Sequence, residues 1–249
     1  MKAPRCRARV QLGTKVPLHP DSGHYEVCLS ASQWAKLFPD GQPGRKLGCG
    51  MFACAWERKP GSQEVVKITR DSDDVAGLLT LRGHPRVAAV REAYRLERSG
   101  KSLEPGSEGR SVPVYAIVTE RLGSLPLDVG EMLDLIPTDK LQRDYHEAER
   151  RHRVKQFRAS PEVRSDIDRV CVRQGQEWAE TCSTFLHEVV DTQEDLARRG
   201  IVFLDTHAGN IGRDREGRWK ILDLGNSLVP MRPPRITSLR GRLRVRRVR

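Results

Sequence analysis

The fold of this chain is most constrained by two short apolar runs, which are joined by a polar segment. The first run, residues 201–204, ends at Asp205, and the second run, residues 219–222, ends at Asp223. Turn-forming residues at 214–217 separate the two runs. The pattern predicts two short strands joined through a turn, each of which delivers a carboxylate at its end.

Asn210 adds an amide to these two carboxylates and lies in the segment that follows Asp205. Carboxylate and amide oxygens are hard ligands, and Mg²⁺ in phosphoryl-transfer sites is held by a few such groups together with phosphate oxygens. We therefore expect Asp205, Asn210 and Asp223 to belong to a site that handles Mg²⁺ and a phosphoryl group.

The composition is that of a polar chain with enough residues to bury a core. The chain has 249 residues, of which 37% are apolar and 5% aromatic, and its mean hydropathy is −0.58. A chain of this length forms one domain or two lobes. No apolar run approaches the roughly 18 residues of a membrane span, and the basic N-terminus has no apolar segment behind it. We therefore expect neither a membrane span nor a secretory signal.

The formal net charge of +11 is concentrated near the C-terminus, because residues 232–249 contain eight arginines and no acid. Such a segment can be an electrostatic handle for an acidic partner, for nucleic acid or for a membrane surface, or it can be a solvated end of the chain. A nucleic-acid-binding protein is the weaker interpretation, since no basic patch interleaved with aromatic residues accompanies the segment.

The six cysteines contain no C-x-x-C pair, and the Cys49 and Cys54 spacing has no matching second pair. We therefore expect no zinc site and interpret the cysteines as free thiols. Free thiols, together with the lack of a signal segment, favour a cytoplasmic location.

Gly48, Gly50 and the small Ala53 form the spacing G-x-G-x-x-A. Glycine lets a backbone bend tightly and bring its N–H groups close to phosphate oxygens. A turn at 59–62 and a strand at 64–68 follow, so the glycines are expected in a β-hairpin rather than at the start of a helix. The alternative interpretation is an ordinary glycine-bearing hairpin with no ligand.

Lys67 lies inside the strand at 64–68, and alternation places it on the opposite face from Val66 and Ile68. A lysine in a strand most often points to solvent. Behind a glycine hairpin, Lys67 becomes a candidate phosphate ligand.

Residues 85–99 predict a helix that begins at a proline and ends before Gly100. Glu92 stands in the middle of this helix. It is either a surface carboxylate or the group that holds the Lys67 amine, and Glu97 is the second candidate for that role.

The remaining segments predict strands followed by helices. Residues 112–120 read as strands, and the pattern breaks at 121–124. The heavily charged residues 125–165 are helix-forming. Residues 174–199 carry an apolar stripe at helical spacing and end at Gly200, which predicts a core helix.

Taken in order, these motifs resemble those of the protein-kinase-like superfamily over residues 45–228. The matching segments are the glycine loop at 48–53, the strand lysine at 65–67, the helix glutamate at 91–93, the hinge at 119–122, the D-x-x-x-x-N loop at 205–210 and the D-L-G at 223–225. The resemblance implies a bilobal α+β fold, with a β-rich N-lobe carrying one main helix and a mostly helical, truncated C-lobe.

The resemblance also implies an ATP site. Lys67 would hold the α- and β-phosphates, with Glu92 orienting it, and backbone groups of the hinge would face adenine. The residues implied in nucleotide binding are Gly48, Gly50, Ala53, Lys67, Glu120 and Leu122.

The same resemblance assigns Asn210 and Asp223 to Mg²⁺ and assigns Asp205 to the acceptor hydroxyl, whose proton it would accept. Three positions depart from the family pattern, of which Ala53 in place of the third glycine is the mildest. Phe203 replaces the usual His or Tyr before the catalytic Asp, which removes a hydrogen-bonding group that steadies the loop. His207 replaces a lysine, so that the loop is more similar to those of antibiotic and small-molecule phosphotransferases, and we include His207 among the candidate catalytic residues.

The leading hypothesis is an ATP-dependent kinase that transfers the γ-phosphate of Mg-ATP to a hydroxyl acceptor, with protein Ser/Thr preferred. The alternatives are a small-molecule kinase of the aminoglycoside-phosphotransferase type and a pseudokinase or nucleotide-binding module that acts through its basic tail. The expected organisation is an extension at 1–44, an N-lobe at 45–123, a reduced C-lobe at 124–230 and an arginine-rich tail at 231–249.

Overall fold

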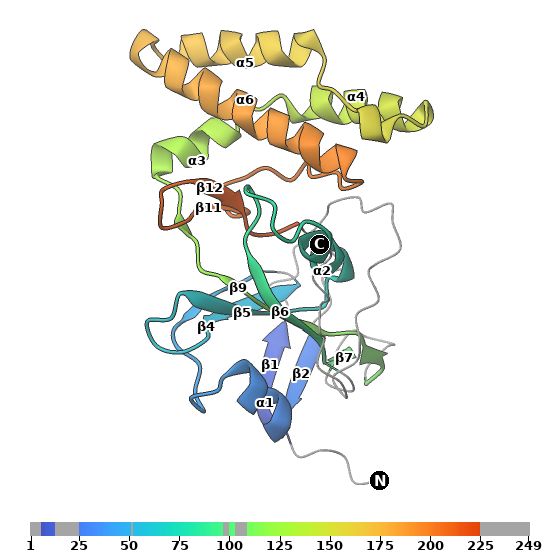
Figure 1. Cartoon of the computed structure of the whole chain (residues 1–249), viewed down its shortest axis with the longest axis vertical. Helices are drawn as coiled ribbons and strands as arrows, with labels where there is room; N and C mark the ends of the chain where they lie inside the picture. The colour runs from blue at the N-terminus through green and yellow to red at the C-terminus, as the bar shows by residue number, and fades with distance from the viewer. Residues whose placement is uncertain (1–5, 13–24, 51, 97–99, 103–108, 225–249) are drawn as a thin grey trace. The chain divides into compact units, whose positions relative to one another are not determined.

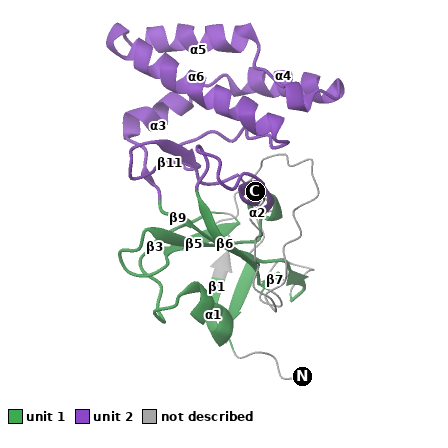
Figure 2. Cartoon of the chain, in the orientation of Figure 1, with its two compact units in different colours: residues 1–75, 89–121, 233–249 green, residues 76–88, 122–232 purple. Residues whose placement is uncertain are grey.

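The structure is a computed structural model, and it describes residues 6–12, 25–50, 52–96, 100–102 and 109–224. The described residues form antiparallel sheets and helices (Figure 1). They divide into two compact units: one lies within residues 1–75 and 89–121, and the other lies within residues 76–88 and 122–232 (Figure 2). We call them unit 1 and unit 2.

Unit 1 contains a five-stranded antiparallel sheet with the order β3-β4-β5-β9-β6. Its strands are β3 (Lys46–Cys49), β4 (Ala53–Glu57), β5 (Glu64–Thr69), β6 (Val90–Arg95) and β9 (Tyr115–Glu120). The central strands β5 and β9 are nearly continuous runs of buried residues, as expected for strands with neighbours on both sides. The predicted glycine hairpin at β3–β4 and the predicted strand at 64–68 are confirmed.

A second sheet in unit 1 has the order β1-β2-β7-β8. It contains β1 (Cys6–Leu12), β2 (Tyr25–Ser30), β7 (Gly100–Ser102) and β8 (Ser111–Val112). Helix α1 (Ala31–Leu37) follows β2 directly and begins with a capping box between Ser30 and Gln33. Apolar residues of β2 and α1 enter the same buried cluster as those of β5 and β9, so this part of the predicted extension contributes to the core of unit 1.

Helix α2 (Ser72–Thr80) was not predicted, although its start carries a clear signal. Asp71 caps the helix, because its Oδ1 accepts hydrogen bonds from the backbone N–H groups of Asp73 and Asp74 at 2.9 and 3.1 Å. An acidic cap followed by an apolar run is the pattern of a helix N-terminus.

The predicted helix at 85–99 is wrong, because residues 90–95 form strand β6, which pairs with β9. The buried residues Val87, Val90, Ala93 and Leu96 recur every third position, which suggests a helix. A register irregularity between Val90 and Glu92 breaks the two-residue alternation of the strand. The bulged strand thus produces the spacing that a helix would show.

In the described part of unit 2, four helices lie wholly within the unit: α3 (Leu127–Leu133), α4 (Thr138–Arg150), α5 (Pro161–Arg173) and α6 (Gln176–Arg198). A 3₁₀ turn, Val154–Gln156, connects α4 to the segment before α5. Helices α5 and α6 lie side by side (Figure 1) and bury apolar faces at helical spacing. The predicted helix at 174–199 is confirmed, and Gly200 ends it with a φ of 83°, a conformation that favours glycine.

A small antiparallel sheet completes unit 2, with the order β10 (Gly123–Ser124), β11 (Ile211–Arg213) and β12 (Trp219–Ile221). Asp214 closes the β11–β12 turn by accepting hydrogen bonds from the N–H groups of Glu216 and Arg218. Burial acts to raise the pKa of the Asp214 carboxyl, but hydrogen bonds from Arg218 and Lys220 outweigh burial and hold that pKa well below its usual range.

The apolar run at 201–204 does not form one of the strands, although Ile201, Val202 and Phe203 are buried. It passes through the interior of unit 2 outside the named strands. Instead of the strand predicted before Asp205, a buried connection joins α6 to the loop that begins at Asp205.

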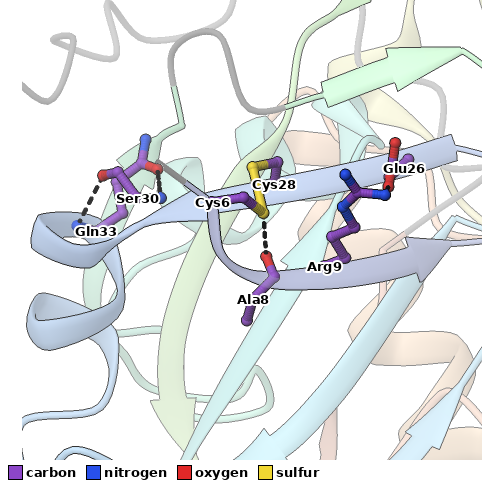
Figure 3. The surroundings of a disulfide bond; sticks show 7 residues. All are labelled: Cys6, Ala8, Arg9, Glu26, Cys28, Ser30 and Gln33. Carbon is purple, nitrogen blue, oxygen red and sulfur yellow. Dashed lines mark hydrogen bonds and ion pairs between the residues drawn. A yellow bond between two sulfur atoms is a disulfide. The ribbon is translucent and has the colours of Figure 1, made fainter. Parts of the chain in front are cut away.

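The six cysteines form three disulfides, Cys6–Cys28, Cys49–Cys54 and Cys171–Cys182, so the prediction of free thiols is wrong. Figure 3 shows the first, which joins the paired strands β1 and β2. Cys49 and Cys54 are direct partners across β3 and β4, with Cα atoms 4.1 Å apart. The pairings follow from strand and helix register, which the spacing of the cysteines in the sequence does not reveal. They also remove one of the two grounds for expecting a cytoplasmic location, which stays a prediction.

Among the helices that the structure describes, none has the length and apolar character needed to cross a membrane.

Candidate functional site

Asp205 and Asn210 meet in the loop between α6 and β11. The Nδ2 of Asn210 donates to the backbone oxygen of Asp205 at 2.9 Å and to its Oδ2 at 3.1 Å. Asn210 is 8% exposed, so these bonds hold its amide in one orientation. With Nδ2 engaged, Oδ1 is the Asn210 atom that can bind a cation.

Strands β11 and β12 bring Asp223 to the same loop. Ile211 pairs with Ile221 in the hairpin, and the N–H of Leu222 donates to the backbone oxygen of Asn210 at 2.8 Å. Asp223 follows directly and is half-buried. The hairpin therefore brings the backbone just before Asp223 alongside Asn210.

His207 lies over the Asp205 carboxylate. Its Nε2 is 3.7 Å from Oδ1 of Asp205, and its Nδ1 accepts a hydrogen bond from the Gly209 N–H at 3.0 Å. Because Nδ1 is an acceptor, the ring proton of neutral His207 is on Nε2, the nitrogen that faces Asp205. His207 thus lies beside the Asp205 carboxylate, at a distance longer than a direct hydrogen bond.

Phe203 is buried, and its backbone oxygen accepts a hydrogen bond from Nε2 of Gln193 at 2.9 Å. Gln193 is 2% exposed and belongs to α6. A side chain ten positions earlier thus holds the backbone at Phe203, two residues before Asp205. A polar residue on the apolar face of α6 was the signal that could have identified it.

In unit 1, Lys67 forms an ion pair with Asp74. The Lys67 Nζ is 2.8 Å from Oδ2 of Asp74, and the two residues are 9% and 1% exposed. Lys67 comes from the buried strand β5 and Asp74 from the first turn of α2. The amine of Lys67 is therefore fixed beside a buried carboxylate, between a strand and a helix of the chain.

Glu92 does not have the predicted place on a helix. It lies on β6, pairs with Arg58 at 3.2 Å and accepts a hydrogen bond from the Tyr94 hydroxyl. The carboxylate observed on Lys67 belongs to Asp74, and we correct the prediction accordingly. The second candidate, Glu97, lies outside the described residues.

The glycine hairpin is closed by its own backbone and by a disulfide. Gly50 N–H donates to the oxygen of Ala53 at 2.8 Å, next to the Cys49–Cys54 bridge. A Cβ built on Gly48 or Gly50 meets no atom within 4 Å. Packing of the described residues therefore does not require glycine at either position.

Glu120 and Leu122 have structural contacts of their own. The N–H and carboxylate of Glu120 bond to the oxygen and N–H of Ala89 at 3.0 and 2.7 Å. Leu122 lies against Gly212, where an added Cβ would come within 2.7 Å of the leucine Cβ. Their contact with adenine stays a prediction.

The described contacts thus form two groups. Unit 2 brings together Asp205, His207, Asn210 and Asp223, whereas unit 1 pairs Lys67 with a carboxylate that was not predicted.

No family model and no curated protein matches this chain. Among solved structures, the chain is similar to the structure of the Cydia pomonella granulovirus kinase PK-1, with a TM-score of 0.39 and 12% sequence identity. The match covers 76% of this chain and 54% of the other, so the chain spans about half the length of the viral kinase. A similarity at this level does not decide the function, which has to rest on the residues of the site.

Proposed function

We propose that the protein is an ATP-dependent phosphotransferase, a kinase that moves the γ-phosphate of Mg-ATP to a hydroxyl acceptor. The observation that carries the proposal is the arrangement of Asp205, Asn210 and Asp223 in one loop and hairpin. Phosphoryl transfer needs positioned charge more than covalent chemistry from the protein, and these residues provide positioned oxygen ligands.

Asp205 is the group proposed to orient the acceptor hydroxyl and accept its proton. Its carboxylate is 38% exposed, so an acceptor can reach it, and Asn210 holds one of its oxygens. The hydrogen bond from Gln193 to the Phe203 oxygen supports the chain just before it.

The donor set fits Mg²⁺, because Oδ1 of Asn210 and the Asp223 carboxylate are hard oxygen ligands. Few protein ligands suffice, since phosphate oxygens complete the coordination of Mg²⁺ in such sites. When bound, the ion would neutralise charge on the phosphates.

Lys67 is proposed to hold the nucleotide phosphates, with Asp74 in place of Glu92 as the residue that positions it. The exposed Gly48 and Gly50 leave room for phosphates to approach the hairpin backbone. Glu120 and Leu122 are proposed to present backbone groups to adenine.

The preferred acceptor is a protein Ser/Thr hydroxyl, and a small hydroxylated molecule is the second candidate. The observation that favours the second is His207 beside Asp205, in a loop that resembles those of small-molecule phosphotransferases. Label transfer to casein or histone, compared with transfer to aminoglycosides, distinguishes the two.

The proposal is tested by incubating the full chain with γ-labelled ATP and Mg²⁺. Wild type should hydrolyse ATP or transfer the label, and Asp205→Ala and Asp223→Ala should each lower the rate by about a hundredfold or more. Asp139→Asn, which changes an exposed carboxylate on α4, is the matched control and should keep the activity. Mg-ATP binding without turnover in wild type would identify a pseudokinase instead.

A further inference from the structure

A cavity of about 350 Å³ opens on unit 2 between α3 and the first turns of α6. Asp128 and Glu131 of α3 supply its acidic wall, and Trp178 of α6 supplies its aromatic wall. Met132 and Leu135 line it as well. We call this cavity the α3–α6 groove; none of its lining residues belongs to the candidate site described above.

Exposed apolar side chains lie on the helices around the α3–α6 groove. The large apolar residues that are exposed in the described part of the chain are Leu47, Leu127, Val172 and Trp178. Three of these four lie on α3, α5 and α6, and one of them, Trp178, lines the groove. Scattered exposed apolar residues need no explanation, but Trp178 is 44% exposed and lines a cavity, where its ring can contact a ligand.

The groove is also acidic. Besides Asp128 and Glu131, the exposed carboxylates Asp134, Glu177 and Glu180 lie on or beside the same two helices. Within the described residues, none of these five carboxylates takes part in an ion pair, whereas Asp166 on α5 pairs with Lys140. Unpaired carboxylates beside apolar surface favour a cationic ligand and disfavour anionic ones such as nucleic acid or a lipid headgroup.

The groove wall is held in place before any ligand binds. The Cys171–Cys182 disulfide joins the end of α5 to α6, with Cα atoms 5.6 Å apart, and Cys182 lines the groove. A surface ordered in advance loses less conformational entropy on binding.

We propose that the α3–α6 groove docks an arginine-bearing segment of a partner protein. A guanidinium can stack on the Trp178 ring and donate to the carboxylates of Asp128 and Glu131, while a neighbouring apolar side chain packs on Met132 and Leu135. Arginine fits better than lysine because its planar group stacks on aromatic rings and is less strongly hydrated. The proposal is independent of phosphotransfer, since it concerns binding without nucleotide.

The probe is a labelled synthetic peptide with the sequence of residues 232–249, which contains eight arginines and no acid. Fluorescence anisotropy with the full chain should show saturable binding. Asp128→Asn/Glu131→Gln, and separately Trp178→Ala, should each weaken binding by about tenfold. The matched control, Asp73→Asn/Asp139→Asn, removes two exposed carboxylates elsewhere and should leave the affinity within about twofold.

A peptide in which every arginine is replaced by lysine keeps the charge and should bind several times more weakly. Equal binding of the two peptides would overturn the preference for arginine. Failure of both the full chain and a chain without residues 232–249 to bind the peptide would overturn the docking site, and so would binding that both groove variants leave unchanged. Binding that appears only after residues 232–249 are deleted would identify the chain's own tail as the occupant of the groove. It would overturn the proposal that the occupant belongs to a partner protein. Circular dichroism of each variant checks that it is folded.

Discussion

At the scale of single residues, the ion pair between Lys67 and Asp74 gives a direct test of the proposed nucleotide site. Both are buried, and the Asp74 carboxylate is 2.8 Å from the Lys67 amine. We expect Asp74→Asn to lower kcat/KM for ATP by about tenfold to a hundredfold, because the amine loses the charge that positions it. Steady-state ATP turnover measures the change.

Glu92→Gln is the matched control for Asp74→Asn. Glu92 pairs with Arg58 on the sheet of unit 1, so its change should leave ATP turnover within about twofold and alter stability only slightly. A larger loss of turnover in Glu92→Gln than in Asp74→Asn would restore Glu92 as the partner of Lys67 and overturn the correction.

At the scale of secondary-structure elements, the β3–β4 glycine hairpin and the β11–β12 hairpin differ in the space around their glycines. A Cβ on Gly48 or Gly50 meets nothing within 4 Å, and neither residue has a positive φ. A Cβ on Gly212 would come within 2.7 Å of the backbone oxygen of Gly123. The first hairpin therefore tolerates added side chains where the second does not.

We expect Gly48→Ala and Gly50→Ala to leave the free energy of unfolding within about 0.5 kcal/mol of wild type, and to raise the KM for ATP by crowding the phosphates. Gly212→Ala should lower the free energy of unfolding by about 1–3 kcal/mol, because backbone must move. Urea unfolding and ATP kinetics on the same samples separate the two effects. An unchanged KM in both hairpin variants would argue against phosphate binding there.

At the scale of the whole molecule, each unit contains at least one of the three disulfides. We expect Cys171→Ser/Cys182→Ser to lower the free energy of unfolding by about 2–3 kcal/mol, because the bridge restricts the unfolded chain. Urea unfolding with and without dithiothreitol measures the effect. If the reductant leaves wild type unchanged, the cysteines are not paired in solution and the free-thiol prediction is restored.

Some features of the protein follow from the sequence alone, because they depend on local periodicity and turn chemistry. The glycine hairpin, the strand that holds Lys67, the helix ending at Gly200 and the approach of Asp223 to Asn210 are of this kind. Each depends on residues close together in the chain, so their spacing is enough to predict them.

Other features depend on contacts between distant segments and were decided only by the tertiary structure. The buried residues of the bulged strand β6 have the three-residue spacing of a helix. Pairing with β9 is what makes this segment a strand rather than a helix. The cysteine pairs depend on strand and helix register, and the hydrogen bond from Gln193 to Phe203 depends on how α6 packs against the site loop. The sequence by itself thus determined that Asp205, Asn210 and Asp223 come from one loop and hairpin of unit 2. Tertiary packing determined that Asp74 is the carboxylate on Lys67, because that ion pair joins a strand and a helix whose contact the local sequence pattern does not specify.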